Sequence, residues 1–299
     1  MSENINRRNF VKSASVLAAA PLAGSGLSVN LSVPTSAVES VGVELAIATI
    51  CLDGFGDENF EPAFHIIPQT PIRNVEFNVW NPRNITPSGI ASIRERCYQN
   101  GLTPISLQGT SFGGNVVKDV GHKLWLMEQT KALGCRRVKF TGSRRGEQGG
   151  LENVIAVLKE LAPAAEEMDV LIAVENHANN NIENIEDYDK IFAAVDSTHV
   201  GMCLDMGHFD GASVSNFDVI DRFHHKVNHI DLKDVVAFGT YKSVPYGTGI
   251  TKGEEIVQAL IDKGYSGYIV IEQAPPKEGL ELVQEMTRIY NQFADFERS

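Results

Sequence analysis

The chain has 299 residues, of which 43% are hydrophobic and 21% are charged, an ordinary composition for a soluble globular protein with a sizeable core. Its formal net charge of −12 argues against nucleic acid as a main partner, because phosphate contacts need clustered Lys and Arg. The cysteines lie far apart and form no CxxC pair, which indicates buried thiols rather than disulfides or a zinc ribbon: Cys51, Cys97, Cys135 and Cys203.

The first 40 residues differ in character from the rest of the chain. Arg7 and Arg8, followed by Phe10 and Lys12, precede an Ala-rich apolar run over 13–29, and this order resembles a twin-arginine export signal. The run is too short and too rich in small residues to be a stable membrane anchor, and no cysteine follows it to carry a lipid. We therefore predict a signal peptide and linker over 1–40, export to the periplasm, and the twin-arginine machinery as a partner. A disordered cytosolic tail is the alternative.

From residue 41 onward, short β-rich runs alternate with amphipathic helical stretches. The predicted strands are 44–50, 73–79, 103–108, 137–141, 170–175, 200–205, 227–232 and 268–272. The predicted helices are 59–66, 88–99, 117–133, 151–168, 185–195, 216–224, 254–263 and 280–293. Gly101, Gly134 and Gly264 each stand between a helix and the next strand, where a helix-ending glycine is expected.

Eight strand-then-helix units in a row predict a single α/β domain over 41–299, a closed (β/α)8 TIM barrel. An open, doubly wound sheet is the competing fold. It would need a Gly-rich phosphate loop after its first strand, and the segment 51–56 has no GxGxxG pattern.

Polar residues collect where the predicted strands end, which is the mouth where such barrels place their active sites. They are Glu76, Asn78, Lys139, Thr141, Glu175, His177, Asp205, His208, His229, Asp231, Lys233 and Glu272. Because side chains alternate along a strand, His229 and Asp231 share the interior face of the seventh strand. Each carboxylate taken alone is also consistent with a helix N-cap or a loop residue.

Several buried carboxylates at one mouth would repel each other, and a divalent cation is the simplest compensation. Oxygen-rich ligation with at most one imidazole favours a Mn²⁺, Mg²⁺, Co²⁺ or Zn²⁺ type of site over a thiolate site.

Four short motifs stand in order at barrel spacing: the segments 174–177 (VENH), 204–208 (LDMGH), 229–234 (HIDLKD) and 267–272 (GYIVIE). With the loop 244–249, they resemble the xylose isomerase-like barrels, specifically the sugar phosphate isomerase/epimerase family. That resemblance implies one divalent metal ion bound by Glu175, Asp205 and Glu272. It also implies that Glu175 and Glu272 are catalytic and move a proton, and that His208 contacts a substrate oxygen.

The fourth metal ligand departs from the pattern of this family. The family usually has a histidine directly before the Leu-Lys-Asp run, whereas this chain has Asp231 there and His229 two residues earlier. The face shared by the two residues admits either, and the motif register favours Asp231. The remaining polar residues are candidates for substrate binding: His177, His208, His229, Lys139 and Lys233.

The predicted reaction is isomerisation or epimerisation of a keto sugar or related polyol through an enediolate, with the two glutamates as acid and base. A lyase or hydratase acting on an oxidised sugar or glycoside shares the first step and is the main alternative. A phosphodiesterase similar to AP endonucleases and a sugar-binding barrel without catalysis are further alternatives.

Overall fold

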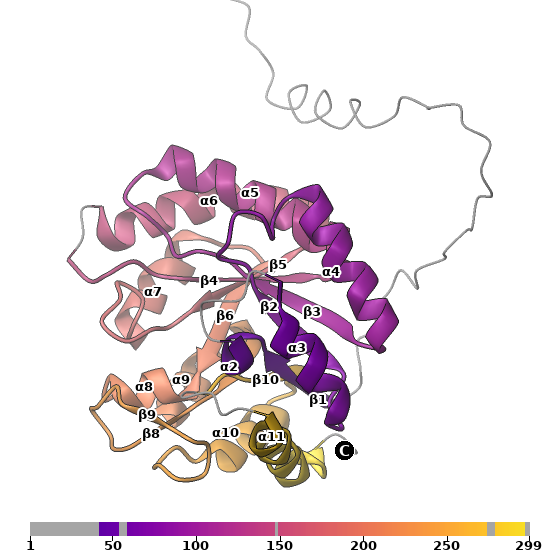
Figure 1. Cartoon of the computed structure of the whole chain (residues 1–299). Coiled ribbons are helices and arrows are strands. Elements are labelled where there is room, and N and C mark those ends of the chain that lie inside the picture. The colour runs from indigo at the N-terminus through magenta and orange to yellow at the C-terminus, as the bar shows by residue number, and fades with distance from the viewer. Residues whose placement is uncertain (1–41, 54–58, 147–148, 274–278, 297–299) are drawn as a thin grey trace, which may run out of the picture. The chain divides into compact units, whose positions relative to one another are not determined.

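The computed structural model describes residues 42–53, 59–146, 149–273 and 279–296. These residues lie within one unit of the chain, Val38–Ser299. The expected signal segment over 1–40 lies outside the described residues, so it stays a prediction. Eight parallel strands form a closed barrel in the order β1-β10-β7-β6-β5-β4-β3-β2, and helices surround it (Figure 1). The predicted (β/α)8 fold is therefore confirmed.

The barrel strands begin and end close to their predicted positions. They are β1 (Val43–Ala48), β2 (Asn74–Asn78), β3 (Thr103–Gln108), β4 (Arg137–Thr141), β5 (Leu171–Glu175), β6 (Val200–Asp205), β7 (Val227–Leu232) and β10 (Gly267–Ile271). The first strand ends at Ala48 instead of Ile50, because Ile50 starts a short helix.

All eight predicted helices are present. They are α3 (Glu61–Ile66), α4 (Pro87–Asn100), α5 (Val116–Leu133), α6 (Gly150–Met168), α7 (Ile185–Ala194), α9 (Asn216–Phe223), α10 (Gly253–Asp262) and α11 (Gly279–Phe293). Shorter elements that the periodicity did not predict are α2 (Ile50–Asp53), α8 (Met206–Gly211), the 3₁₀ turns η1 (Ile67–Gln69) and η2 (His224–Lys226), and the ribbon strands β8 (Asp234–Val235) and β9 (Ser243–Val244). Within the described ranges, no helix has both the length and the apolar character needed to cross a membrane.

Local sequence explains where the helices end and which face they bury. In α6, Val154, Val157, Leu158 and Leu161 are fully buried at a spacing that forms one apolar stripe against the strands. Gly101 and Gly134 cap α4 and α5 in the left-handed conformation, and Gly264 has a positive φ after α10, so the predicted glycine stops are confirmed.

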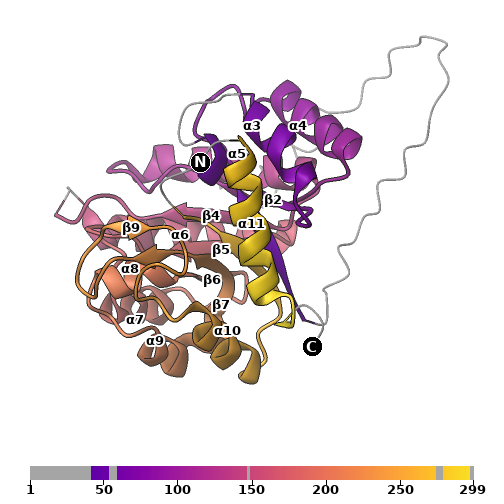
Figure 2. The same cartoon turned by 60° about the horizontal axis from the view of Figure 1, so that its bottom comes forward.

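The barrel closes between its first and last strands. β1 pairs with β10 in parallel register from Val43↔Gly267 to Ile47↔Ile271. Next to this seam, the Cys51 thiol donates to the Ile271 carbonyl at 3.1 Å and accepts from the Gln273 amide at 3.0 Å. Figure 2 shows the last helix, α11, beside α3 from the first unit of the barrel. All four cysteines are buried free thiols, as predicted.

Candidate active site

Four carboxylates from four neighbouring strands meet at the C-terminal end of the barrel. Glu175 and Asp205 end β5 and β6, Asp231 lies in β7, and Glu272 follows β10. One carboxylate oxygen from each of the four lies within 4.8 Å of the others. Asp205 and Asp231 are register partners on adjacent strands, so their side chains point into the same interior. We call these four residues the carboxylate ring.

The ammonium group of Lys139, from β4, contacts this ring from inside the barrel. Its Nζ atom lies 2.7 Å from Asp231 Oδ2 and 2.6 Å from Glu272 Oε2. The same Nζ atom lies 2.8 Å from Glu76 Oε1, a carboxylate that β2 contributes below the ring. Lys139 has no exposed surface. Its predicted role in substrate binding stays a prediction, and its observed partners are all carboxylates.

A second ammonium group, that of Lys233, lies at the outer side of the ring. Its Nζ atom is 2.7 Å from Asp205 Oδ2, 3.4 Å from Glu272 Oε1 and 3.1 Å from His208 Nε2. The ring of His177 packs on His208 with centroids 4.0 Å apart, and both histidines are half-buried. The three predicted substrate-binding residues Lys233, His208 and His177 therefore gather in one place, which we call the rim.

Burial lowers the pKa of His177 and lowers that of His208 well below its usual range, and the charge of Lys233 lowers both further. The two imidazoles are therefore neutral at physiological pH. Each ring then offers one nitrogen as donor and one as acceptor, which suits contacts to hydroxyl groups.

Asp205 combines two roles that the sequence left as alternatives. Its Oδ1 atom caps α8 by accepting from the His208 amide at 2.8 Å, while its Oδ2 atom faces Lys233. The Asn176 side chain accepts from the Asp205 amide at 2.9 Å and donates to the Asp205 carbonyl at 3.0 Å. The cap and the amide thus fix the direction in which Oδ2 points.

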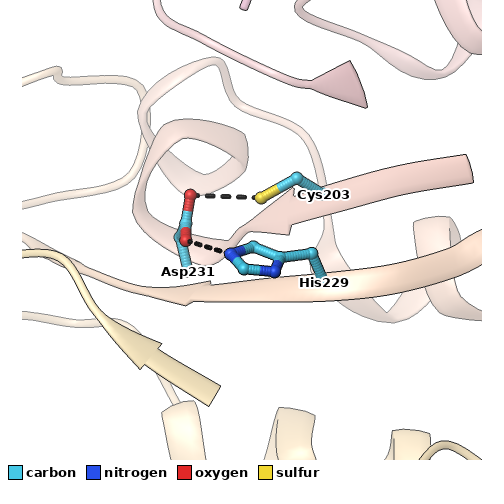
Figure 3. A group of neighbouring side chains, drawn as sticks. All are labelled: Cys203, His229 and Asp231. Carbon is cyan, nitrogen blue, oxygen red and sulfur yellow. Dashed lines mark hydrogen bonds and ion pairs between the residues drawn. The ribbon is translucent and has the colours of Figure 1, made fainter. Parts of the chain in front are cut away.

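A buried polar layer lies beneath the ring. Figure 3 shows Asp231 between Cys203 of β6 and His229 of its own strand. The Cys203 thiol donates to Asp231 Oδ2 at 3.1 Å, and His229 Nε2 lies 3.5 Å from Asp231 Oδ1 (Figure 3). The same His229 nitrogen lies 3.0 Å from Glu76 Oε2, which also accepts from the Ser106 hydroxyl at 2.7 Å.

This geometry bears on the open choice of a fourth ligand. Asp231 offers an oxygen to the group that also includes Glu175, Asp205 and Glu272. His229 groups instead with Cys203 and Asp231, one layer deeper. The arrangement favours Asp231 as the fourth candidate ligand, and His229 lies beside Asp231 in the layer below.

The charges of the inner layer are tightly paired. Burial would raise the pKa of Glu76, but Lys139 and His229 lower it to about 2. Burial would likewise raise the pKa of Asp231, but Lys139 and His229 lower it. Burial would lower the pKa of Lys139, but Asp231, Glu272 and Glu76 raise it well above its usual range. These contacts favour the ammonium form of Lys139.

The outer part of the ring has excess negative charge. Burial raises the pKa of Glu175 well above its usual range, despite Lys139, and raises that of Asp205 to about 7, despite Lys233. Buried Glu175 Oε1 has no hydrogen-bond partner among the described residues. In the absence of another cation, both shifts favour the protonated form of these carboxyl groups.

The charge balance of the whole cluster fits a divalent cation. The ring and Glu76 carry five carboxylates, against the two ammonium groups of Lys139 and Lys233. With all five ionised, three negative charges remain, or two when His229 is protonated. Glu76 and Asp231 raise the pKa of His229, although burial opposes this. Four hard oxygen donors with this residual charge suit Mn²⁺, Mg²⁺, Co²⁺ or Zn²⁺.

Asp234, the last residue of the Leu-Lys-Asp run, is fully buried and organises the loop beside the ring. Its Oδ1 atom accepts from the amides of Val235 at 2.9 Å and Thr251 at 3.0 Å. Its Oδ2 atom accepts from the amides of Gly247 at 3.0 Å and Gly249 at 2.8 Å. We call this arrangement the Asp234 clamp. Gly247 has φ 82°, a conformation that favours glycine.

Sequence reasoning gave no role to Glu76, Cys203 or Asp234. Glu76 stands at the end of the second strand, two residues before Asn78, and Cys203 stands two residues before Asp205. Strand alternation would therefore have placed both on the interior face. The clamp had no such signal, because its four amides come from a loop without periodicity.

Known proteins with similar sequences include the inosose dehydratase of Clostridium botulinum (strain Alaska E43 / Type E3), which is 23% identical over 133 residues. The match covers 38% of this chain and 44% of that protein, so it spans less than half of the relative.

Two solved structures have a similar fold. The IolI protein with a bound zinc atom superposes with a TM-score of 0.70 at 18% identity, over 85% of this chain and 99% of that chain. The D-allulose 3-epimerase from Methylomonas sp., in complex with D-allulose, superposes with a TM-score of 0.69 at 13% identity, over 85% of this chain and 97% of that chain. Residues 66–290, most of the barrel, match the model of the family described as xylose isomerase-like TIM barrels. The chain belongs to this family.

Proposed function

We propose that this protein is a metal-dependent enzyme that moves a proton next to the carbonyl group of a keto sugar or related polyol, and so isomerises or epimerises it. The carboxylate ring carries this proposal. It places two glutamates, Glu175 and Glu272, together with Asp205 and Asp231 around one point at the barrel mouth. The similarity to an epimerase that binds D-allulose supports the substrate class.

The two glutamates differ in environment, which suits an acid and a base. Glu272 lies 2.6 Å from Lys139 and 3.4 Å from Lys233, and contact with two ammonium groups suits the carboxylate that removes the carbon-bound proton. Glu175 has a buried oxygen, Oε1, without a hydrogen-bond partner among the described residues, and we assign to it the proton that returns to carbon. Removal of a proton by Glu272 leaves an enediolate, and delivery of a proton from Glu175 to carbon completes the reaction.

A divalent ion held by Glu175, Asp205, Asp231 and Glu272 would supply a Lewis acid that stabilises negative charge on the substrate oxygens. The rim would hold the substrate against this ring. Neutral His177 and His208 would exchange hydrogen bonds with hydroxyl groups, and Lys233 would orient an oxygen that gains negative charge.

The experiment is incubation of the Mn²⁺-loaded protein with a panel of keto sugars in D₂O, followed by NMR. We expect deuterium at the carbon next to the carbonyl and a new epimer or isomer. Glu175→Gln and Glu272→Gln should each lower the rate at least about 100-fold, because each removes a proton-transferring group. Exposed Glu160→Gln on α6 is the matched control and should leave the rate unchanged. Exchange at wild-type rates in both active-site variants would contradict the proposal.

Dehydration is a second candidate, favoured by one feature of the rim. Lys233 Nζ lies 3.1 Å from His208 Nε2, so a proton donor stands beside the ring where a hydroxyl group could leave. Similarity to an inosose dehydratase supports the same reaction class. The D₂O experiment separates the candidates: a product 18 mass units lighter than the substrate indicates a lyase, and unchanged mass apart from deuterium indicates an isomerase or epimerase.

We also propose that the protein is exported to the periplasm by the twin-arginine route, on the pattern of Arg7, Arg8 and the apolar run that follows. Replacing both arginines with lysine should leave the full-length chain in the cytoplasm when cells are fractionated. Equal periplasmic amounts of the wild-type and the doubly substituted chain would contradict this.

A further inference from the structure

Lys139 pairs with three carboxylates of the candidate site. Its Nζ atom contacts Glu76 at 2.8 Å, Asp231 at 2.7 Å and Glu272 at 2.6 Å, and these carboxylates come from three different strands. The side chain has no exposed surface. A lysine in this position binds two layers together, because Asp231 and Glu272 belong to the carboxylate ring and Glu76 lies below it.

Two common roles of an active-site lysine do not fit these contacts. A nucleophilic lysine must lose its proton, whereas three carboxylates within 2.8 Å stabilise the ammonium form of Lys139. A lysine that binds substrate needs an ammonium group that the substrate can reach, whereas Lys139 has no exposed surface and its Nζ atom is enclosed by three carboxylates. Charge compensation from below the ring is the role that its position allows.

We propose that Lys139 is a positioning residue that acts as the fixed counter-cation of the carboxylate ring and limits how tightly the ring binds a divalent ion. It does so by occupying Asp231 Oδ2 and Glu272 Oε2 and by cancelling one negative charge of the cluster. Glu76 has the opposite effect, because it adds a negative charge on the far side of the same ammonium group. This proposal rests on the metal centre proposed above and does not depend on which reaction the enzyme catalyses.

The test is titration of the metal-free full chain with Mn²⁺. Calorimetry and the EPR signal of free Mn²⁺ both measure the affinity. Lys139→Met should bind Mn²⁺ at least about tenfold more tightly than wild type, because a positive charge next to two ligands is gone. Its metal-free form should melt at a lower temperature, since three buried carboxylates each lose one of their partners. Glu76→Gln should bind Mn²⁺ about tenfold more weakly, and the double variant should return to within about threefold of wild type.

Lys123→Met is the matched control. Lys123 is equally buried, but it pairs with Asp119 at 3.6 Å and with the Ser111 carbonyl at 3.1 Å, away from the ring. This variant should lose stability without a change in Mn²⁺ affinity. A merely structural role for Lys139 would weaken Mn²⁺ binding as the site loosens, which is the opposite sign.

Three results would count against the proposal. A folded Lys139→Met variant with unchanged or weaker Mn²⁺ binding overturns it. If that variant does not fold, Glu76→Gln decides, and unchanged affinity in Glu76→Gln overturns the proposal. A wild-type chain that binds no Mn²⁺ overturns the metal centre and this proposal with it, whereas normal wild-type binding with an unaffected Lys139→Met variant overturns the role of Lys139 alone.

Discussion

Replacing Asp234 tests whether the Asp234 clamp holds the loop beside the carboxylate ring. The buried carboxylate of Asp234 accepts four backbone hydrogen bonds, at 2.8 to 3.0 Å, from Val235, Gly247, Gly249 and Thr251. In Asp234→Ala, all four amides lose their acceptor.

The loss of stability in Asp234→Ala depends on which of the four amides can hydrogen-bond to water instead. Val235 and Thr251 are buried, whereas Gly247 is exposed and Gly249 is half-buried. A hydrogen bond to a charged group contributes about 1.5–3 kcal/mol, and the two amides near the surface can be rehydrated. We therefore expect Asp234→Ala to lower the free energy of unfolding by about 3–5 kcal/mol. Asp234→Asn can keep its carbonyl toward the buried pair and should cost about half as much.

The assay is urea unfolding followed by circular dichroism, with EDTA present so that metal binding does not contribute. Asp262→Asn, an exposed change on α10, is the control and should stay within about 0.5 kcal/mol of wild type. The Tyr246 amide of the clamped loop donates to Gln273 at 2.6 Å, next to Glu272, so Asp234→Ala should also reduce activity. A loss of stability below about 1 kcal/mol in Asp234→Ala would refute the clamp.

Three further results are expected. Burial raises the pKa of Asp205 to about 7, although Lys233 lowers it. Mn²⁺ affinity, measured by calorimetry, should therefore rise as pH increases through about 7, and binding should release protons. An affinity that does not change with pH would contradict this. Because that pKa lies above the ordinary 3.8, the contribution of Asp205 to the stability of the metal-free protein is present below about pH 4 and lost as pH rises through about 7, which melting curves in EDTA can check. Gly207→Ala places a Cβ 2.8 Å from Lys233 Cγ, so it should lower the free energy of unfolding by about 1–3 kcal/mol and also lower activity. Wild-type kinetics in this variant would show that Lys233 is free to move.

Much of the fold could be predicted because local pattern and global topology agree. β3, β4, β6 and β7 have the predicted bounds, since each is a short β-rich run between clear helix signals. Strand alternation also placed Asp231 and His229 in the interior, where both are fully buried. The small elements α8 and the β8–β9 ribbon were missed, because they are too short to have a periodicity.

The partners of Lys139 could not be predicted from the sequence. Glu76, Asp231 and Glu272 belong to three other strands, and only the closed barrel brings them to one ammonium group. Register adds a second difficulty. The register of β6 with β7 shifts between the pairs Met202↔Val227 and Cys203↔His229, and this irregularity sets which residues face each other there.

The long sequence separation between Lys139 and its carboxylate partners has a consequence for how the chain folds during synthesis. A ribosome makes Lys139 long before two of its carboxylate partners, because Asp231 follows 92 residues later and Glu272 133 residues later. Until the last strand emerges, desolvating this ammonium group would leave it short of compensating charge. A nascent or C-terminally truncated chain should therefore stay hydrated and open at its centre, where proteases can reach it. The buried lysine thus makes completion of the polypeptide a condition for closing the interior.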